Sequence, residues 1–173
     1  MQFSSPVTFF FILAACTVCS LAQQPASAPV TADHDKKRAA EVDARGDQAM
    51  GFSHDMTTHH LHLLRTGGAI EVEADNPSDA QSKTAIRDHM AVIAGLFSQG
   101  DFSLPMFIHA TTPPGVETMK RLKTEITYHA EDTTRGVQVR ITTKNPEALR
   151  AIHRLLRFQI EDHRTNDPLE MQQ

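Results

Sequence analysis

Two stretches of the chain show the same order of apolar and polar positions. Apolar residues alternate with polar ones over 70–74 and again over 137–141, with the period of two that half-buried strands require. In each copy this strand follows another strand and a turn, which begin near Thr57 and Thr124. An Asn-Pro pair and a segment of helical periodicity come next, and such a pair is typical of a helix start. The chain therefore contains a duplicated strand–turn–strand–helix unit.

The duplication predicts the fold class. Two ββα units give an α+β domain in which a four-stranded antiparallel sheet has one face covered by two long helices. We expect Gly67 and Gly68 to adopt the positive φ values of the first hairpin turn. Between the copies, the pattern predicts a short strand or extended segment at 106–108 and a short helix at 116–122. A duplicated unit often places a site at the seam between its halves.

The N-terminus has the pattern of a secretory signal sequence. Residues 7–18 are almost all apolar, and no charged side chain precedes Asp33. This run is shorter than the about 20 residues that cross a bilayer, and the small residues of Ser20-Leu21-Ala22 follow it, as in a signal peptide. We therefore expect cleavage after Ala22, a periplasmic or secreted protein, and no transmembrane segment after processing. Cys16 follows a Leu-Ala-Ala run that resembles a bacterial lipobox, so a lipid anchor at Cys16 is an alternative.

These features divide the chain into four parts. They are a signal peptide at 1–22, a flexible linker with a short, weakly held helix at 23–49, a single α+β domain at 50–167 and a tail at 168–173. We expect the short helix to be interrupted near Gly46. Both cysteines precede the cleavage site, so the mature chain would have neither a disulfide nor a thiol ligand. Any metal site would then consist of histidine, methionine and carboxylate side chains.

The charge of the chain argues against one class of partner. The net charge is −4 with neutral histidines, so we expect no binding of nucleic acid. No phosphate-binding glycine loop, G-x-S-x-G elbow or HExxH motif is present, and no protein partner is indicated. All ten histidines lie in the expected mature chain, which makes imidazole its main source of site chemistry.

Three histidines form an HHxH motif on the first predicted strand: His59, His60 and His62. Because Leu61 and Leu63 should face the core, His59 shares the core face, and His60 and His62 share the outer face. A His-x-His pair on one face can hold Zn²⁺ or Cu²⁺. A polar outer surface of the sheet is an equally good interpretation of His62.

A metal site needs further ligands, which other segments offer. His109 ends the apolar segment at 106–108, and His89 lies near the apolar stripe of the first long helix. We therefore predict a zinc or copper site made by His59, His60 and His109, with His89 as a further ligand. Adjacent residues on a regular strand point to opposite faces, so only a bulge or twist would let His59 and His60 bind one ion.

The remaining histidines have weaker claims to a site. Met50 and Met56 flank His54, a combination that suits copper, but methionines more often serve as apolar anchors. His153 and His163 lie about 15 Å apart on the last helix and cannot share one ion. His153 is expected to be a satisfied core residue. A charged His163 would interact favourably with the C-terminal end of the helix dipole.

Several segments between Met50 and Asp167 together resemble an uncharacterised family of small secreted bacterial proteins. They are Met50-Gly51-Phe52, Thr57-Thr58-His59-His60, Gly67-Gly68-Ala69-Ile70-Glu71-Val72, Gly100-Asp101-Phe102 and the run from Leu156 to His163. The resemblance implies that the paired histidines, together with His89, His109 and His163, belong to the family motif. His54 and His62 depart from it.

Similar sequences sometimes carry the label aspartate carbamoyltransferase, which the residues here do not support. That enzyme has two α/β domains and is much longer than this chain. Its Ser-Thr-Arg-Thr phosphate loop has only a faint counterpart in Thr133-Thr134-Arg135, which falls in a predicted hairpin turn.

Three classes of function are compatible with the sequence. The first is an exported domain that binds zinc or copper through histidines. The second is a metal-free protein-interaction or structural module of the cell envelope, which carries no cofactor. The third is a small enzyme with a catalytic histidine, whose minimum requirement is a pocket that joins His109 to an acidic residue within hydrogen-bond reach.

Overall fold

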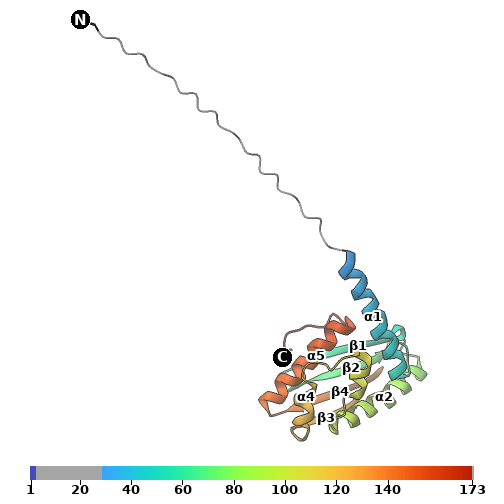
Figure 1. Ribbon diagram of the computed structural model, residues 1–173. Coiled ribbons are helices and arrows are strands. Elements are labelled where there is room, and N and C mark those ends of the chain that lie inside the picture. The colour runs from blue at the N-terminus through green and yellow to red at the C-terminus, as the bar shows by residue number, and fades with distance from the viewer. Residues whose placement is uncertain (3–28, 173) are drawn as a thin grey trace.

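The computed structural model describes residues 1–2 and 29–172. The predicted signal peptide and the possible lipid anchor at Cys16 lie outside these residues. In chain order, the elements are α1 (Pro29–Met50), the 3₁₀ helix η1 (His54–Met56), β1 (Thr57–Leu64), β2 (Gly67–Ala74), α2 (Ala80–Ser98), α3 (Ser103–His109), α4 (Val116–Arg121), the 3₁₀ helix η2 (Lys123–Glu125), β3 (Ile126–Asp132), β4 (Gly136–Thr143) and α5 (Pro146–His163) (Figure 1).

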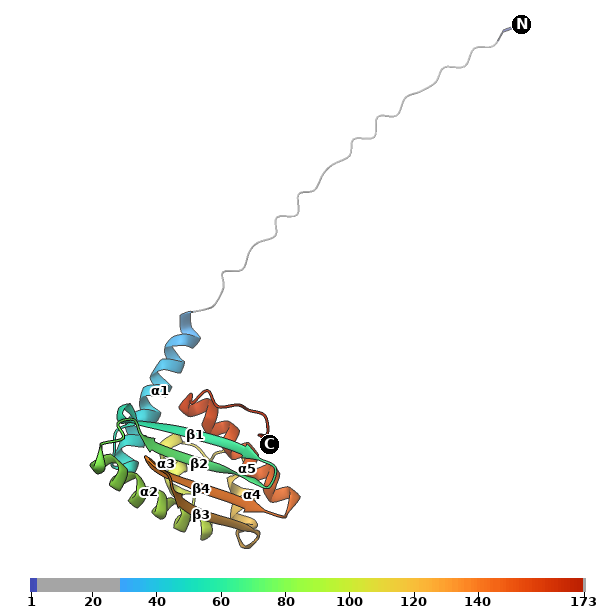
Figure 2. The same ribbon diagram turned by 180° about the vertical axis from the view of Figure 1, so that it is seen from behind.

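The predicted α+β fold with a duplicated ββα unit is confirmed. The sheet has four strands in the order β1-β2-β4-β3, and every neighbouring pair is antiparallel. Figure 2 shows the sheet from the face that the helices leave uncovered. The second strand of each copy, β2 or β4, lies at the centre of the sheet. The long helix of each copy packs largely on strands of the other copy. The helix of the first copy, α2, packs on β3 and β4, while α5 packs on β1 and β2.

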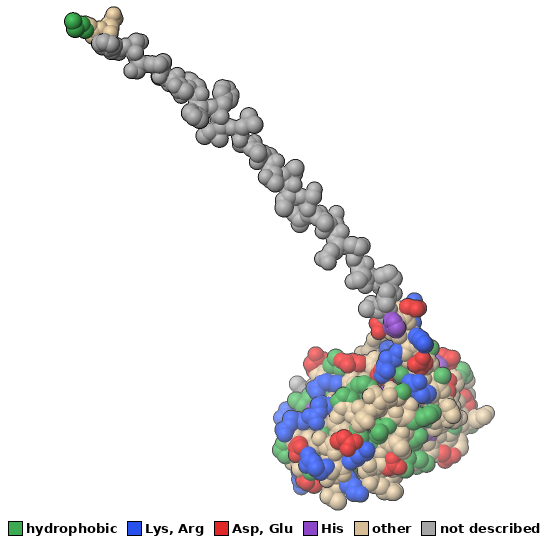
Figure 3. All heavy atoms as spheres, in the orientation of Figure 1, with side chains coloured by type: hydrophobic (Ala, Val, Ile, Leu, Met, Phe, Trp, Pro, Cys, Tyr) green, Lys and Arg blue, Asp and Glu red, His purple; other side chains and the backbone are tan. Residues whose placement is uncertain are grey.

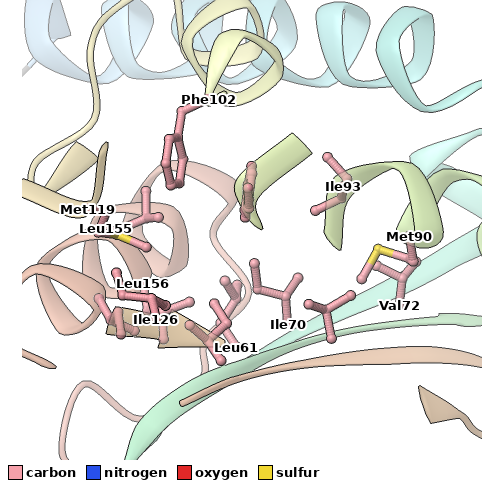
Figure 4. Close-up of a cluster of buried hydrophobic side chains, with 14 of the residues drawn as sticks. Leu61, Ile70, Val72, Met90, Ile93, Phe102, Met119, Ile126, Leu155 and Leu156 are labelled. Atoms are coloured by element: carbon pink, nitrogen blue, oxygen red, sulfur yellow. The ribbon is translucent and has the colours of Figure 1, made fainter. Parts of the chain in front are cut away.

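Strand alternation places the core on the helical side of the sheet. Leu61 and Leu63 are buried, and the register of β1 with β2 runs without a break from Thr57 to Leu64. Figure 4 shows how such strand residues meet side chains of the helices, among them Met90 from α2 and Leu155 from α5. Burial of each large apolar side chain contributes about 1.5–3 kcal/mol to folding, so this shared layer holds the two copies together.

Gly67 has the predicted positive φ, at 152°, whereas Gly68 does not, and neither glycine lies in the hairpin turn itself. The turn consists of Arg65 and Thr66, and Gly67 and Gly68 already belong to β2. A Cβ on Gly67 would lie 1.9 Å from the carbonyl oxygen of Ile141 on β4. The position therefore needs glycine mainly because two backbones approach closely.

The long helices begin at different kinds of cap. Asn145 caps α5 as predicted, since its side chain accepts from the backbone N–H groups of Glu147 and Ala148 at 2.7 and 3.2 Å. In the first copy, however, the Asn76-Pro77 pair makes a turn, and α2 begins three residues later. Asp79 caps it by accepting from the N–H groups at positions 81 and 82.

The prediction of a strand or extended segment at 106–108 is wrong, because these residues lie in α3. The buried residues of this helix are Pro105, Ile108 and His109, which have the i, i+3, i+4 spacing of a helix face. Pro105 fits because it lies in the first turn, where backbone N–H groups have no intrahelical partner. The helix ends at Ala110, whose φ is 50°.

Helix α1 is longer than predicted and runs without interruption through Gly46. It starts at Pro29, so the last residues of the predicted linker are helical. Among its side chains from Asp33 onward, the buried apolar ones are Ala39 and Val42, and its first half extends away from the rest of the molecule (Figure 1). Polar contacts supplement this narrow stripe, such as the hydrogen bond from Arg45 Nε to the carbonyl oxygen of Ile108 at 2.7 Å.

Within the described residues, no single helix is long and apolar enough to cross a membrane. The bent pair α2 and α3, whose axes meet at 112°, has the length and composition of a membrane span only when the two helices are counted together.

Candidate functional site

A small cavity lies where the two copies meet. It has a volume of about 70 Å³ and is enclosed by Met50 of α1, by β1 and β2, by α2 and α3, and by the last two turns of α5. A larger hollow of about 810 Å³ lies at another edge of the sheet, but it is an open surface depression lined mainly by threonines. The small cavity is the more informative of the two because histidines gather around it.

Four histidines, each from a different element, line this cavity: His59 of β1, His89 of α2, His109 of α3 and His163 of α5. We call them the cavity histidines. The rings of His109 and His163 meet edge to face with centroids 4.8 Å apart, and those of His59 and His163 are parallel at 6.1 Å. Phe52 packs near the rings of His89 and His59, with centroid distances of 5.7 and 6.5 Å.

His109 is oriented by a hydrogen-bonded pair of charged side chains, Asp162 and Arg38. Its Nδ1 lies 2.5 Å from Oδ2 of Asp162, and Oδ1 of Asp162 accepts from Arg38 Nε at 2.7 Å. Burial raises the pKa of Asp162, but the hydrogen bonds from His109 and Arg38 outweigh it, so the net pKa is lowered. An ionised Asp162 can only accept, which makes Nδ1 of His109 the protonated nitrogen. Nε2 is left with a free lone pair.

The cavity favours neutral imidazoles. Burial, together with the charges of neighbouring histidines, lowers the pKa of His59 to about 4. The same two causes lower the pKa of His163 to about 3. Burial also lowers the pKa of His89, and in His109 it outweighs the opposing effect of Asp162. At neutral pH these rings are therefore uncharged and can donate a lone pair.

Three of these rings have no hydrogen bond from the protein. The side-chain hydrogen bonds within 29–172 include none to a ring nitrogen of His59, His89 or His163. In the same residues, the only fully buried side-chain polar atom without a partner is the hydroxyl of Tyr128. The imidazole nitrogens therefore keep access to open space, either in the cavity or in the hollow beside it. The three residues are only partly buried, so their ring nitrogens are accessible to a ligand or to water.

A surface hollow of about 280 Å³ leads toward the cavity and shares Met50, His59 and His163 with it. Arg164 bridges the hollow by binding Asp43 of α1 at 2.7 Å. His54, at its rim, binds Asp47 through Nδ1 at 3.0 Å. Burial lowers the pKa of His54, but the hydrogen bond to Asp47 and the nearby carboxylates outweigh it and raise the net pKa. The mouth of the site is thus charged, whereas its interior is neutral.

The structure unites three of the four predicted metal ligands. His59, His89 and His109 meet at the cavity, but His60 does not, because β1 is regular and His60 points to the outer face. There it lies beside His62, with ring centroids 6.2 Å apart. The bulge that a shared His59–His60 site would need is absent from the register of β1 and β2.

Two residues of the site were not predicted from the sequence. His163 was placed in the family motif by the resemblance but was not predicted as a metal ligand, and Asp162 was not predicted as a site residue. Asp162 instead reaches His109, 53 positions away. Spacing along α5 does give one usable signal, because His163 is four residues from buried Gln159 and so shares its face. His153 is a satisfied core histidine as predicted, with Nε2 2.9 Å from two backbone carbonyl oxygens.

As the side chains stand, no three histidine or carboxylate groups within 29–172 are arranged around one ion position. Comparisons of the chain with protein-family models, with curated proteins and with solved structures find no match. The chemistry of the site itself is therefore the basis for assigning a function.

Proposed function

We propose that this domain binds one transition-metal ion, zinc or copper, in the cavity lined by the cavity histidines, His59, His89, His109 and His163. The observation that carries the proposal is the convergence of four imidazoles, from four elements, on a cavity of about 70 Å³.

The size of the cavity favours an ion over an organic ligand. A water molecule takes about 30 Å³ in the liquid, so the cavity has room for an ion and one or two waters. Pockets for organic ligands usually measure about 300–1,000 Å³. A larger ligand would have to displace core residues such as Met90 and Ile93, which line the same space.

The protonation state of the rings suits metal binding. Zinc and copper bind neutral imidazole, and a site whose ligands are already unprotonated at pH 7 releases no protons on binding. His109 has the additional feature of metal-binding histidines, a carboxylate that accepts its other N–H and orients the ring.

The spacing of one pair of cavity histidines matches what one ion requires. Two imidazoles bound to one ion at a tetrahedral angle have ring centroids about 5 Å apart. The His109–His163 distance of 4.8 Å agrees with this value. His59, at 6.1 Å and parallel to His163, would have to turn about its side-chain bonds. Met50 lines the same cavity, and its thioether would add to the affinity for Cu(I) in particular.

His59, which lines the cavity, and the exposed His129 provide a matched test. We expect the purified protein to contain zinc or copper by elemental analysis, or to bind one equivalent tightly by calorimetry. His59→Ala should weaken this tight binding by at least about tenfold, since a ligand matters at least as much as its supporting contacts. His129→Ala, at an exposed histidine of β3 outside the cavity, should leave it unchanged. Absence of tight binding, or equal effects of the two variants, would exclude the cavity as the site.

A catalytic use of His109 is the second candidate, favoured by its short contact with Asp162. A carboxylate-oriented imidazole is a competent general base, and the pair meets the minimum geometric requirement for a histidine enzyme. The cavity lining contains no serine, threonine or cysteine, however, and it holds only a very small substrate. Activity retained by metal-free protein would favour this function over metal binding.

A metal-free interaction module has less support. Figure 3 shows acidic, basic and apolar side chains intermingled on one face of the molecule. The exposed large hydrophobic residues of the folded part come from different segments, such as Val92 of α2, Phe107 of α3 and Leu169 of the tail. A surface that binds a protein partner normally has a broader exposed apolar patch.

A further inference from the structure

The outer face of β1 carries a second pair of histidines that the cavity does not use. The rings of His60 and His62 lie 6.2 Å apart at an angle of 30°. Both side chains remain partly exposed, as does Glu71 on the neighbouring strand. They lie on the side of the sheet that the helices leave uncovered, which Figure 2 shows.

The C-terminal tail contacts both rings through Nδ1. His60 Nδ1 lies 3.1 Å from Oδ1 of Asp167, and His62 Nδ1 lies 3.1 Å from the side-chain oxygen of Gln172. The tail is itself anchored to this edge of the sheet. Asp167 accepts from the backbone N–H of Leu61 at 2.8 Å, and Gln172 donates its backbone N–H to Leu63 at 2.7 Å.

These contacts determine which nitrogen is free. Burial raises the pKa of Asp167, but hydrogen bonds from Thr165, Leu61 and His60 lower it further, so the carboxylate is ionised and can only accept. The amide oxygen of Gln172 is likewise an acceptor. Nδ1 of His60 and of His62 can therefore donate to the tail, which leaves Nε2 of each ring for another partner.

His62 then presents an unusual contact. Its Nε2 lies 3.5 Å from Oε2 of Glu71. A metal ion between the two atoms, or a proton on Nε2, would make this contact favourable. A nitrogen and an oxygen that bind one ion at about 2.1 Å and a tetrahedral angle lie about 3.4 Å apart, close to the distance found here.

We propose that His60, His62 and Glu71 form a surface site for a divalent transition-metal ion, Zn²⁺ or Cu²⁺, separate from the cavity. Glu71 and His62 lie at the spacing of two ligands, and a turn of the exposed His60 ring adds the third. Two imidazoles and one carboxylate are a common donor set for zinc that leaves a position open to water. Asp167 and Gln172 are positioning residues, which accept the second N–H of each ring as the outer contacts of metal-bound histidines do.

The site would connect metal binding to the C-terminal tail. Each tail contact orients a ligand, so an ion at His60 and His62 stabilises the docked tail, and the docked tail strengthens binding by the same factor. The rival occupant of the gap is a proton on His62, which would form an ion pair with Glu71 and need no metal.

A Zn²⁺ titration of the full-length protein, followed by NMR of the histidine ring nitrogens and backbone amides, distinguishes these occupants. We expect Zn²⁺ to shift Nε2 of His60 and His62 and the amides of the tail. His62→Ala and Glu71→Gln should each weaken this response at least about tenfold, and Asp167→Asn should weaken it about tenfold through loss of orientation. His129→Ala is the matched control, because His129 is an exposed histidine on the same face, on β3.

The proposal is overturned if the His60 and His62 rings do not respond to Zn²⁺, or if His62 already has both nitrogens protonated at neutral pH. It is also overturned if His60→Ala/His62→Ala leaves the outer-face response unchanged. Failure at this site is distinguishable from failure at the cavity, since signals of His109 and His163 report the cavity on the opposite side of the sheet.

Discussion

Asp162 is the residue on which the geometry of the cavity depends most. It binds His109 at 2.5 Å and Arg38 at 2.7 Å, and so connects α3, α5 and α1 at one point. Its carboxylate fixes both the tautomer and the orientation of His109. His109 is almost completely buried, so no water replaces a lost partner easily.

Asp162→Asn tests this role. The amide keeps the size of the side chain but removes the charge, so we expect metal affinity at the cavity to fall about 10–100-fold. Calorimetry on the variant measures the change, and circular dichroism checks that the fold is retained. Asp88→Asn is the control, because Asp88 also precedes a helical histidine but is exposed. Equal affinities for the two variants would contradict the positioning role.

Among the elements, the two central strands, β2 and β4, share one structural feature. Each begins with a glycine that lies against a carbonyl oxygen of the other strand. A Cβ on Gly67 would approach Ile141, and a Cβ on Gly136 would approach Val72, both at 1.9 Å from the oxygen. The close approach of β2 and β4 thus depends on the same residue type in both copies, and this approach sets the spacing of the helices above.

Gly136→Ala should destabilise the protein by about 2 kcal/mol or more, because backbone atoms must move to admit the methyl group. Gly95→Ala in α2 is the opposite case, since a Cβ there meets nothing within 4 Å. That variant should gain about 0.5–1 kcal/mol, because alanine favours the helix. Urea denaturation of both variants measures the difference. Similar stabilities would contradict the close-approach explanation.

Sequence periodicity predicted the sheet and both long helices, but not which helix side chains meet at the cavity. The alternation around Leu61 correctly assigned His59 and His60 to opposite faces. The position of His109 was not predictable in the same way, because an apolar run of three residues at 106–108 fits a strand or a helix equally well. Asp162 was missed because its partner is close only in the folded chain.

On the scale of the whole molecule, the duplication explains where the cavity lies. Since α2 reaches across to β2, and α5 packs on β1 and β2 as well as on β4, their histidines meet over the first half of the sheet. His89 comes from the first copy and His163 from the second, while α1 and α3, which lie outside the repeat, close the remaining sides. A single ββα unit could not enclose this site.

The neutral cavity predicts that stability depends on pH. Unfolded histidine titrates near 6.5, whereas the pKa values of His59 and His163 are about 4 and about 3. The unfolded chain therefore binds more protons below pH 6.5, and the free energy of unfolding should fall by about 1.4 kcal/mol per pH unit for each of these histidines. Asp162, Arg164 and His109 also face His163, and their effects are included in its lowered pKa.

Urea denaturation of metal-free protein at pH 7.5, 6.0 and 5.0 measures this dependence. His54 acts in the opposite direction, because its raised pKa adds stability as the pH falls, but the lowered pKa values of the cavity histidines outnumber it. We expect a net loss of stability over this range. Constant or rising stability would show that the cavity histidines are charged in the folded protein.

The most direct test of the cavity as a metal site is X-ray absorption spectroscopy of the His60→Ala/His62→Ala variant loaded with one equivalent of Zn²⁺ or Cu²⁺. This variant keeps the cavity histidines and lacks the ligands of the outer face. We expect at least three imidazole nitrogens at about 2.0–2.1 Å from the metal. A spectrum with only oxygen ligands, or a variant that binds no metal, would contradict it.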